Sequence, residues 1–203
     1  MVVVLDSTFT GLVTGLSLIV AIGAQNAYVL RQGLAREHIG VVVAICALSD
    51  LVLITAGVAG IGTLVERAGW VLDVVRWLGV AFLGWYGVTS LLRARRADAL
   101  LAAATRTTGV RGVAIRAVAL TWLNPHVYLD TVLLLGSIAN HEGPSGRWWF
   151  ALGACLASVL WFSGLGYGAR RAGRFLSSPR AWQALDVLIG VTMLAIALML
   201  ARG

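Results

Sequence analysis

Six long apolar segments restrict what this chain can fold into more than any other feature of its sequence. Each is close to the roughly 20 residues that an α-helix needs to cross the hydrocarbon core of a bilayer. Each is also continuous, which excludes the alternating stretches of about ten residues that form a membrane β-barrel. We therefore expect an all-α integral membrane protein with six transmembrane helices in a single domain, residues 1–203. The segments run over about residues 8–30, 39–62, 70–92, 113–139, 147–168 and 181–201.

Composition supports a multi-pass protein of the cytoplasmic membrane. Hydrophobic residues make up 59% of the chain and charged residues only 12%, whereas soluble domains are about a quarter charged. The formal net charge of +7 is spread over the links between the segments and does not gather on one face. We interpret this charge as a signal of membrane topology and expect no nucleic-acid partner.

The links alternate between strongly and weakly basic. By the positive-inside rule the basic links face the cytoplasm, including the linker over residues 93–112. Both termini then lie outside the cell if all six segments span the membrane. If the first segment is re-entrant instead, the N-terminus lies inside and the other five keep their orientation. The basic links carry Arg31, Arg36, Arg93, Arg95, Arg96, Arg106, Arg111, Arg170, Arg171, Arg174 and Arg180, and the opposite side has Arg67, Arg147 and Arg202.

Polar residues interrupt the first and fourth segments. Pro125 lacks an amide hydrogen and its ring displaces a helical carbonyl, while Asn124 before it disfavours helical geometry. In the first segment, Gly23 stands beside the amides of Gln25 and Asn26. Two helices broken in this way can line a cavity with freed backbone groups. The alternative for the amides is hydrogen bonding between packed helices, worth about 1 kcal/mol per contact.

Two carboxylates lie deep in apolar segments. Asp50 is near the middle of the second segment, and Asp130 is a little beyond the middle of the fourth. A charge at that depth is costly unless it is paired, protonated or hydrated, and no arginine is well placed to pair with either aspartate. The two aspartates therefore indicate a path for a cation, since each can accept an ammonium or guanidinium group or take up a proton. The alternative is a buried carboxylate with a purely structural role.

Neighbouring residues of the fourth segment could assist these carboxylates. His126 precedes Asp130 by one helical turn, so it could relay a proton or simply hold Asp130 by a hydrogen bond. Tyr128 lies on a neighbouring face with Asn124 and is a candidate substrate contact.

Other residues have structural interpretations. Asp186 is near the inner end of the last segment, where we expect it at the membrane interface within reach of Arg180. Arg76 has Asp73 one turn before it, near the outer boundary. Small residues inside the segments are expected to allow close helix packing. These are Cys46, Cys155, Gly11, Gly15, Gly164 and Gly168. We expect no disulfide between the two cysteines among them.

The two halves of the chain resemble each other weakly. Residues 8–92 and 113–201 would each hold three segments, so the second copy would enter the membrane in inverted orientation, as in many secondary transporters. Helices 1 and 4, the two interrupted segments, then occupy equivalent positions. The aligned pairs include Tyr28 with Tyr128, Cys46 with Cys155, and Gly79 with Gly190.

Common enzyme signatures are missing from the sequence. It has no GxxxxGK[ST] phosphate loop, which excludes ATP-driven pumping by this chain, and no HExxH or Cys/His cluster at metal-binding spacing. We expect neither enzymatic activity nor a cofactor or resident metal. An intramembrane aspartyl protease stays open as an alternative, and it would require the two carboxylates to share a proton at about 3 Å.

The interrupted segments also carry a family resemblance. Residues 21–33, Ser49 with Asp50, and residues 121–131 followed by Leu135 and Gly136 resemble the LysE-type basic amino acid exporters. Hydropathy and segment order are similar over the whole chain. The resemblance implies export of lysine or arginine, driven by the membrane potential and the proton gradient. Relatives that export neutral amino acids tend to have Pro-Gly-Pro-Asn where this chain has Gly-Ala-Gln-Asn.

The sequence therefore supports a secondary exporter of basic L-amino acids, lysine, arginine or both. Asp50 and Asp130 would bind the cation or exchange it for protons, and His126 is a further proton-coupling candidate. The alternatives are an exporter of a metal ion, of another small cation or of another amino acid, and a membrane protein without transport activity. A homodimer is compatible with the many glycines. The expected polar contacts are Gln25, Asn26, Asn124 and Tyr128, with helix breaks at Gly23 and Pro125.

Overall fold

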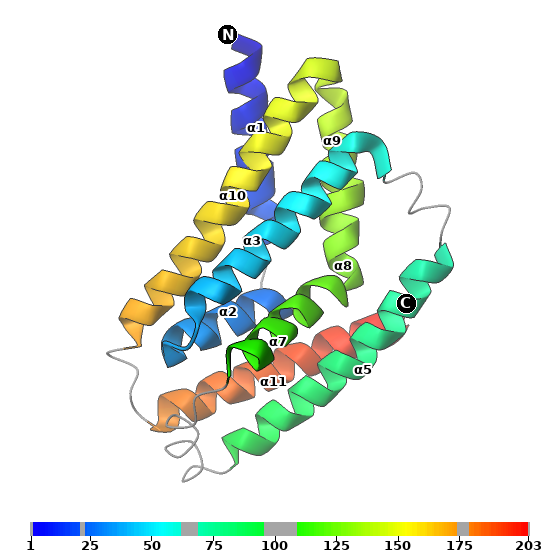
Figure 1. The fold of residues 1–203 in the computed structure, drawn as a ribbon. Helices are drawn as coiled ribbons and strands as arrows, with labels where there is room; N and C mark the ends of the chain where they lie inside the picture. Colours follow the sequence, from blue (N-terminus) through cyan, green and yellow to red (C-terminus); the bar gives the residue numbers. More distant parts are fainter. Residues whose placement is uncertain (1, 21–22, 62–68, 96–108, 174–178, 203) are drawn as a thin grey trace.

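A computed structural model describes residues 2–20, 23–61, 69–95, 109–173 and 179–202. All regular structure in these ranges is helical, which confirms the predicted all-α class (Figure 1). Two of the elements, η1 and η2, are π-helical. In chain order the elements are α1 (Val2–Ile19), α2 (Ala24–Ala35), α3 (Ile39–Ala56), η1 (Gly57–Ile61), α5 (Gly69–Ala94), α7 (Val110–Trp122), α8 (Pro125–Val127), η2 (Tyr128–Leu134), α9 (Leu135–His141), α10 (Gly143–Ala172) and α11 (Pro179–Arg202).

Four helical stretches are long and apolar enough to cross a membrane by themselves, and two bent pairs raise the number to six if each pair is one span. The bends are 82° between α1 and α2, and 60° between α7 and the α8–α9 stretch. Many large apolar side chains also face outward, among them Leu5, Phe9 and Trp85, a surface that suits lipid. The chain is therefore a multi-pass membrane protein. The four single stretches are Ile39–Gly60, Asp73–Ala94, Gly143–Ala172 and Trp182–Arg202.

The first bend follows from the residues at its break. Gly23 has extended backbone geometry (φ −121°, ψ 176°) and stands at the N-cap of α2 without a side-chain cap. Asn26 bridges the break, because its side-chain nitrogen donates a 2.7 Å hydrogen bond to the carbonyl of Ile19 in α1. Its side-chain oxygen accepts a hydrogen bond from the indole of Trp161 at 3.1 Å. The predicted interruption of the first segment is confirmed.

The second bend lies where the sequence places a proline. Asn124 is extended (φ −103°, ψ 106°), and Pro125 occupies the first turn of α8, where its missing N–H costs no helical bond. The Asn124 side chain caps this turn by accepting a 3.2 Å hydrogen bond from the backbone N–H of His126. The predicted interruption of the fourth segment is confirmed as well.

Two π-helical segments pack against each other, which the sequence did not predict. A Cβ on Gly57, in η1, would lie 2.6 Å from the carbonyl oxygen of Val132, in η2. A Cβ on Gly136, at the start of α9, would lie 2.6 Å from the carbonyl oxygen of Gly57. The two backbones are therefore in direct contact, and any side chain at these glycines would separate them. The backbone turns at Gly60, whose φ of 94° favours glycine.

Helix α10 packs against α1, α2, α3 and α9 (Figure 1). Small residues permit this, because a Cβ on Gly11 of α1 would lie 2.0 Å from the carbonyl oxygen of Phe150. A Cβ on Gly15 would lie 3.0 Å from the Cα of Ala154, so the predicted packing role of this pair is confirmed. The prediction for Gly164 and Gly168 was wrong for contacts within this chain. A Cβ at either position would meet nothing within 4 Å.

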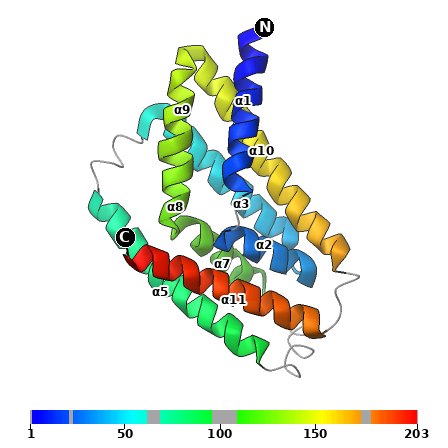
Figure 2. The same ribbon diagram turned by 180° about the vertical axis from the view of Figure 1, so that it is seen from behind.

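Helices α5 and α11 lie side by side as a separate pair (Figures 1 and 2). Their backbones approach at Gly87 and Gly190, where a Cβ on either would lie 3.1 Å from the carbonyl oxygen of the other. Arg76 of α5 donates hydrogen bonds to the carbonyls of Leu200 and Ala201 at the end of α11, where a cation also balances the helix dipole. The predicted partner Asp73 forms no ion pair among the described residues.

The core between these helices is formed by apolar side chains from both halves of the chain. Its larger cluster includes Tyr28, Leu83, Phe162 and Met193, all almost fully buried. A second cluster around Phe150 joins α3, η1, α9 and α10. The two cysteines are buried and form no disulfide with each other, as the sequence predicted, and each belongs to one cluster: Cys46 to the first and Cys155 to the second.

Candidate functional site

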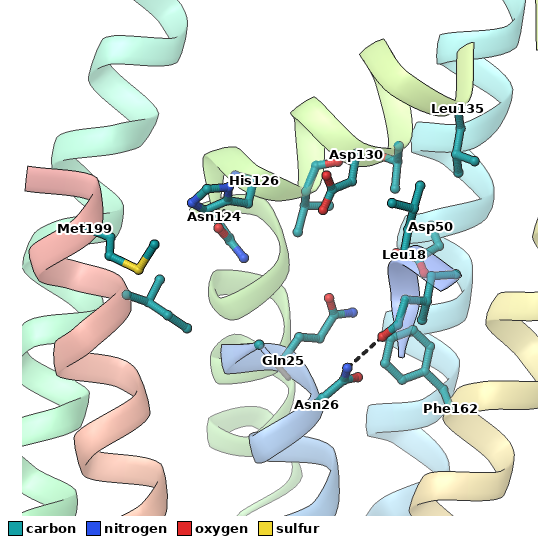
Figure 3. Close-up of a pocket in the computed structure, with 15 residues that line it drawn as sticks. Leu18, Gln25, Asn26, Asp50, Asn124, His126, Asp130, Leu135, Phe162 and Met199 are labelled. Carbon is teal, nitrogen blue, oxygen red and sulfur yellow. Dashed lines mark hydrogen bonds between the residues drawn. The ribbon is translucent and has the colours of Figure 1, made fainter. Parts of the chain in front are cut away.

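A cavity of about 330 Å³ opens between the broken helices, which is within the size range of small-molecule sites. Residues of α1, α2, α3, α8, η2, α9, α10 and α11 contribute to its wall, together with Gly23 and Asn124 from the two breaks (Figure 3). The structure thereby brings together seven of the nine site residues predicted from the sequence. They are Gly23, Gln25, Asn26, Asp50, Asn124, His126 and Asp130.

Asp50 supplies a buried carboxylate to this cavity. It lies in the middle of α3 and is 3% exposed. Its Oδ2 accepts a 2.7 Å hydrogen bond from the hydroxyl of Ser158 on α10. One neutral donor leaves the carboxylate with most of its hydrogen-bonding capacity unused. Asp50 can therefore accept a further donor from the cavity.

Asp130 supplies a second carboxylate from a different helix. It lies on η2, half-buried and in the lining, one turn after His126. No hydrogen bond or ion pair joins Asp130 to another side chain in the described part of the protein. The helical interruption at Pro125 places this turn against the cavity, so the break that the sequence revealed also positions the carboxylate.

Amide groups line the opposite side of the cavity. In Figure 3 the side chain of Gln25 extends from α2 toward the wall formed by Asn124 and Asp130. Its side-chain nitrogen is buried and has no hydrogen-bond partner among the described residues. Asn26 lines the cavity too, although its amide is already bonded to Ile19 and Trp161. The Gln25 side-chain amide can therefore donate a hydrogen bond to a ligand in the cavity.

The N-terminus of α2 also faces the cavity. Gly23, its N-cap, and Gln25 both belong to the lining. The first N–H groups of a helix lack intrahelical acceptors, and here no side chain caps them. Backbone N–H groups and the positive end of the helix dipole form a favourable environment for a carboxylate. The cavity therefore combines an anion-favouring end with two acidic side chains.

Tyr128 and Pro125 are not among the lining residues. The Tyr128 hydroxyl donates a 2.9 Å hydrogen bond to the carbonyl of Trp122, next to the break, and the two rings are in edge-to-face contact. Trp122 in turn donates to the hydroxyl of Ser49, the neighbour of Asp50. Tyr128 is therefore placed to hold the α7 break against α3 rather than to face the cavity.

Comparison with known proteins agrees with this architecture. Residues 16–203 match the LysE type translocator family. The chain belongs to the LysE type translocators. No solved structure matches it.

Curated relatives of this translocator cover nearly its full length. It is 42% identical to a lysine exporter LysE of Corynebacterium diphtheriae, over 91% of this chain and 93% of the relative. It is 39% identical to a lysine exporter LysE of Corynebacterium efficiens, over 94% of this chain and 96% of the relative. It is 43% identical to an arginine exporter ArgO of Salmonella schwarzengrund, over 96% of this chain and 92% of the relative.

Sequence reasoning missed the apolar wall of the translocator's cavity. Phe162 of α10 and two residues of α11, Ile196 and Met199, belong to the lining. A side chain that faces lipid and one that faces an apolar cavity wall have the same sequence signature. No signal in the sequence alone could have separated these residues from the rest of their segments.

The expectation for Asp186 was wrong. Asp186 is fully buried, and its Oδ1 accepts a hydrogen bond from Nε of Arg31 at 3.2 Å. Arg93 lies 3.6 Å from the same oxygen and covers the ring of Tyr86. Asp186 therefore joins α2 to the α5–α11 pair and forms no ion pair with Arg180. Its partners are distant in sequence, whereas the prediction relied on proximity along the chain and therefore chose Arg180.

Two alternative chemistries find little support in the described residues. They contain no group of three or more His, Cys, Asp or Glu side chains that could hold a metal ion. Asp50 and Asp130 share no hydrogen bond there, whereas an aspartyl protease needs a shared proton between its carboxylates. Asp50 bonds Ser158 instead.

Proposed function

We propose that this translocator exports basic amino acids, lysine or arginine, from the cytoplasm. The observation that carries the proposal is the pair of carboxylates, Asp50 and Asp130, that face one cavity between two broken helices. Relatives named for lysine and arginine export support the same substrate class. Carboxylates at this depth recognise an ammonium or guanidinium group because few other groups there can balance the charge.

The cavity suggests how an amino acid would lie in it. The cationic end of its side chain would approach Asp50 and Asp130, where charge-assisted hydrogen bonds are strong. Its α-carboxylate would approach the N-terminus of α2 and the free side-chain nitrogen of Gln25. The apolar wall at Phe162 and Met199 would contact the aliphatic stem. A neutral amino acid would leave the acidic end unpaired.

Exchange against protons would supply the driving force. An interior-negative potential opposes the exit of a cation by about 2.3 kcal/mol per charge for every 100 mV. If one proton enters as one monovalent cation leaves, no net charge moves, and the proton concentration gradient drives export. Asp130 is the better candidate proton carrier because no side chain in the described ranges bonds it, and His126 lies beside it in the lining. Asp50 would hold the substrate.

We infer that the two halves are inverted repeats. Three features support this: each half begins with a broken helix, the breaks at Gly23 and Asn124 meet at one cavity, and α5 pairs with α11, the third helix of the other half. Inverted repeats permit alternating access when one group of helices rocks against the other around a fixed site. The α5–α11 pair and the bundle around α10 are candidates for those groups.

Counterflow of labelled arginine and lysine in proteoliposomes tests the proposed function. Asp50→Asn and Asp130→Asn should each lower exchange at least tenfold, because an amide cannot balance the substrate's charge. Asp73→Asn is the matched control, since Asp73 is exposed on α5 and outside the cavity. Cadmium in a parallel assay distinguishes a metal exporter. Full exchange of both amino acids by both cavity variants would refute the proposal.

A further inference from the structure

A second hollow lies at the C-terminal end of α10; it shares no lining residue with the cavity and has no role in the proposed transport. Its volume is about 360 Å³, and its lining consists of Arg36, Tyr167, Arg170 and Arg171. Three arginines and one tyrosine therefore line it, and among the described residues no carboxylate contributes to its wall. In the part of the chain that the structure describes, none of the three arginines forms an ion pair. Like charges held around one hollow repel each other unless an anion lies between them.

Arg36 is held in this position at a conformational cost. It ends α2 with left-handed backbone geometry (φ 58°, ψ 24°), while its N–H bonds the carbonyls of Gln32 and Gly33. Glycine is the usual residue at such a helix end because it has no Cβ to clash. An arginine here strains the backbone, and strain of this kind is typical of functional positions.

The walls of the hollow are firmly joined. A Cβ on Gly33 of α2 would lie 2.5 Å from the carbonyl oxygen of Gly166 on α10, so the two helices are in backbone contact beside the hollow. A Cβ on Gly173, just after α10, would lie 2.7 Å from the carbonyl oxygen of Leu34. These contacts fix the end of α2, with Arg36, against the last turns of α10.

The length of α10 indicates that the hollow lies at the depth of lipid phosphates. Arg170 follows Trp148 by 22 residues, about 33 Å of helix at 1.5 Å per residue. That length matches the roughly 30 Å hydrocarbon core plus the approach to the headgroups. Trp148 and its neighbour Trp149 are exposed at the opposite end, as interfacial aromatic residues are. The arginine end of α10 then faces the cytoplasm by the positive-inside rule.

An exposed track on α10 leads from the apolar region to the hollow. Leu152, Leu156 and Leu160 are exposed at four-residue intervals, and Gly164 and Gly168 continue the same row. A Cβ on either glycine would meet only open space. The row therefore forms a shallow surface on which an acyl chain could lie below a headgroup in the hollow.

We propose that the hollow formed by Arg36, Tyr167, Arg170 and Arg171 binds the phosphate of an anionic phospholipid in the cytoplasmic leaflet. Arginine forks match phosphate oxygens in pairs, and the Tyr167 hydroxyl adds a neutral donor. Basic pockets between membrane helices on the cytoplasmic side are suited to such headgroups. A free phosphate ion shares the headgroup's chemistry but would not use the apolar track, so lipid is the better occupant.

Native mass spectrometry of the purified full-length chain, with phosphatidylglycerol or phosphatidylcholine added, tests this site. The wild type should retain one phosphatidylglycerol at concentrations where phosphatidylcholine is lost. Arg170→Gln with Arg171→Gln should reduce that retention about tenfold. Arg95→Gln with Arg111→Gln is the matched control, because it removes two exposed arginines on the same side of the membrane but outside the hollow.

Arg36→Gly guards against a folding artefact. Glycine suits the left-handed geometry, so this variant should be at least as resistant to thermal unfolding as the wild type while its lipid retention falls. Equal loss of lipid in both double variants would overturn the proposal, since it would indicate general charge attraction. Displacement of the lipid by 10 mM inorganic phosphate, a concentration on the order of those in cells, would assign the hollow to a soluble anion. If only dimers retained the lipid, and if Arg36→Gly did not change that retention, the track would be assigned to contact with a second copy of the chain.

Discussion

Gln25 has a buried side-chain nitrogen that meets no hydrogen-bond partner in the part of the chain that the structure describes. Such a group loses its bonds to water on folding, at a cost of about 1–3 kcal/mol. Proteins keep few of these groups, and one in a cavity wall is well placed to meet a ligand. We therefore assign the Gln25 amide to the substrate's carboxylate, a role that the α2 N-terminus shares.

Replacing Gln25 with Leu should weaken substrate binding without weakening the fold. Leucine has a similar size and needs no hydrogen bond, whereas a bond to a charged group contributes about 1.5–3 kcal/mol. We expect a rise of about tenfold or more in the KM for arginine in proteoliposomes, with the thermal unfolding midpoint unchanged or higher. Gln32→Leu is the control, because Gln32 is a buried amide on the same helix outside the cavity. Equal KM values for the two variants would contradict this role.

For individual residues, the sequence indicated most of the polar side chains that line the cavity. Asp50, Asn124 and Gln25 were conspicuous because each places a polar group in an apolar segment, where such a group is costly without a partner or a function. Met199 was not, because an apolar residue fits lipid, core and cavity wall equally well. Tyr128 was conspicuous for the same reason as Asp50, yet its hydroxyl bonds the backbone beside the break. Polarity alone does not separate a side chain that supports a site from one that lines it.

The contact between η1 and the η2–α9 stretch brings two backbones together at glycines. Gly57 and Gly136 meet there with no room for a side chain. Asp130 of η2 and Leu135, the first residue of α9, belong to the cavity wall. Loosened π-helical turns often mark functional sites, because they interrupt the regular hydrogen bonding of a helix. The position of Asp130 therefore depends on this contact.

Substituting Gly136 with Ala should damage both stability and transport. The new Cβ would lie 2.6 Å from the Gly57 carbonyl oxygen, and overpacking of this kind costs about 1–3 kcal/mol. We expect a lower thermal unfolding midpoint and slower arginine exchange. Gly84→Ala is the matched control: a Cβ there meets nothing within 4 Å, and alanine favours the helix by about 1 kcal/mol. A Gly136→Ala protein as stable and active as Gly84→Ala would show that the contact is not tight.

Helix breaks were more predictable than helix contacts. Pro125 has a local steric effect that acts wherever the residue stands, so the 60° bend could be expected from the sequence. The turn at Gly60 could not, because a glycine in an apolar helix serves packing as often as bending. Gly164 and Gly168 show the reverse error, since their spacing indicated packing although they face open space. A contact depends on the partner, and the partner is not local.

Over the whole molecule, one buried charge cluster joins the two groups of helices. Asp186 belongs to α11, Arg93 to α5 and Arg31 to α2, which packs in the bundle around α10. One carboxylate thus neutralises part of the charge of two arginines from different groups. Any rocking of the α5–α11 pair relative to the bundle must move Asp186 relative to Arg31. The cluster therefore couples relative motion of the groups to a change in ion pairing.

Asp186→Asn should lower the thermal unfolding midpoint of the purified protein by on the order of 10 °C. Removing one partner of a buried ion pair costs about 3 kcal/mol or more, because the remaining charges lose their counterion. Adding Arg31→Gln to Asp186→Asn should recover part of the loss. Asp73→Asn is the control and should leave the midpoint unchanged. If Asp186→Asn behaved like this control, the cluster would make no net contribution to stability.

The whole-molecule arrangement was the part that the sequence predicted least. Apolar segment lengths predicted six spans, and the structure has four, or up to six if each bent pair is one span. Those lengths could not show that the ion pair of Asp186 reaches Arg31, 155 residues earlier in the chain. Nor could they show that α5 and α11 form a pair apart from the rest. Such contacts depend on shape complementarity between surfaces that are each simply apolar.

The pairing of α5 with α11 has a consequence for how the protein is made. Helix α5 ends at Ala94 and α11 begins at Pro179, so ribosomes working at about 5–20 residues per second need on the order of ten seconds to supply the partner. Throughout that interval the Gly87 face of α5 is covered only by lipid or by the insertion machinery. Nascent chains are therefore most exposed to wrong pairing or to membrane proteases before α11 arrives, a vulnerability that the finished fold conceals.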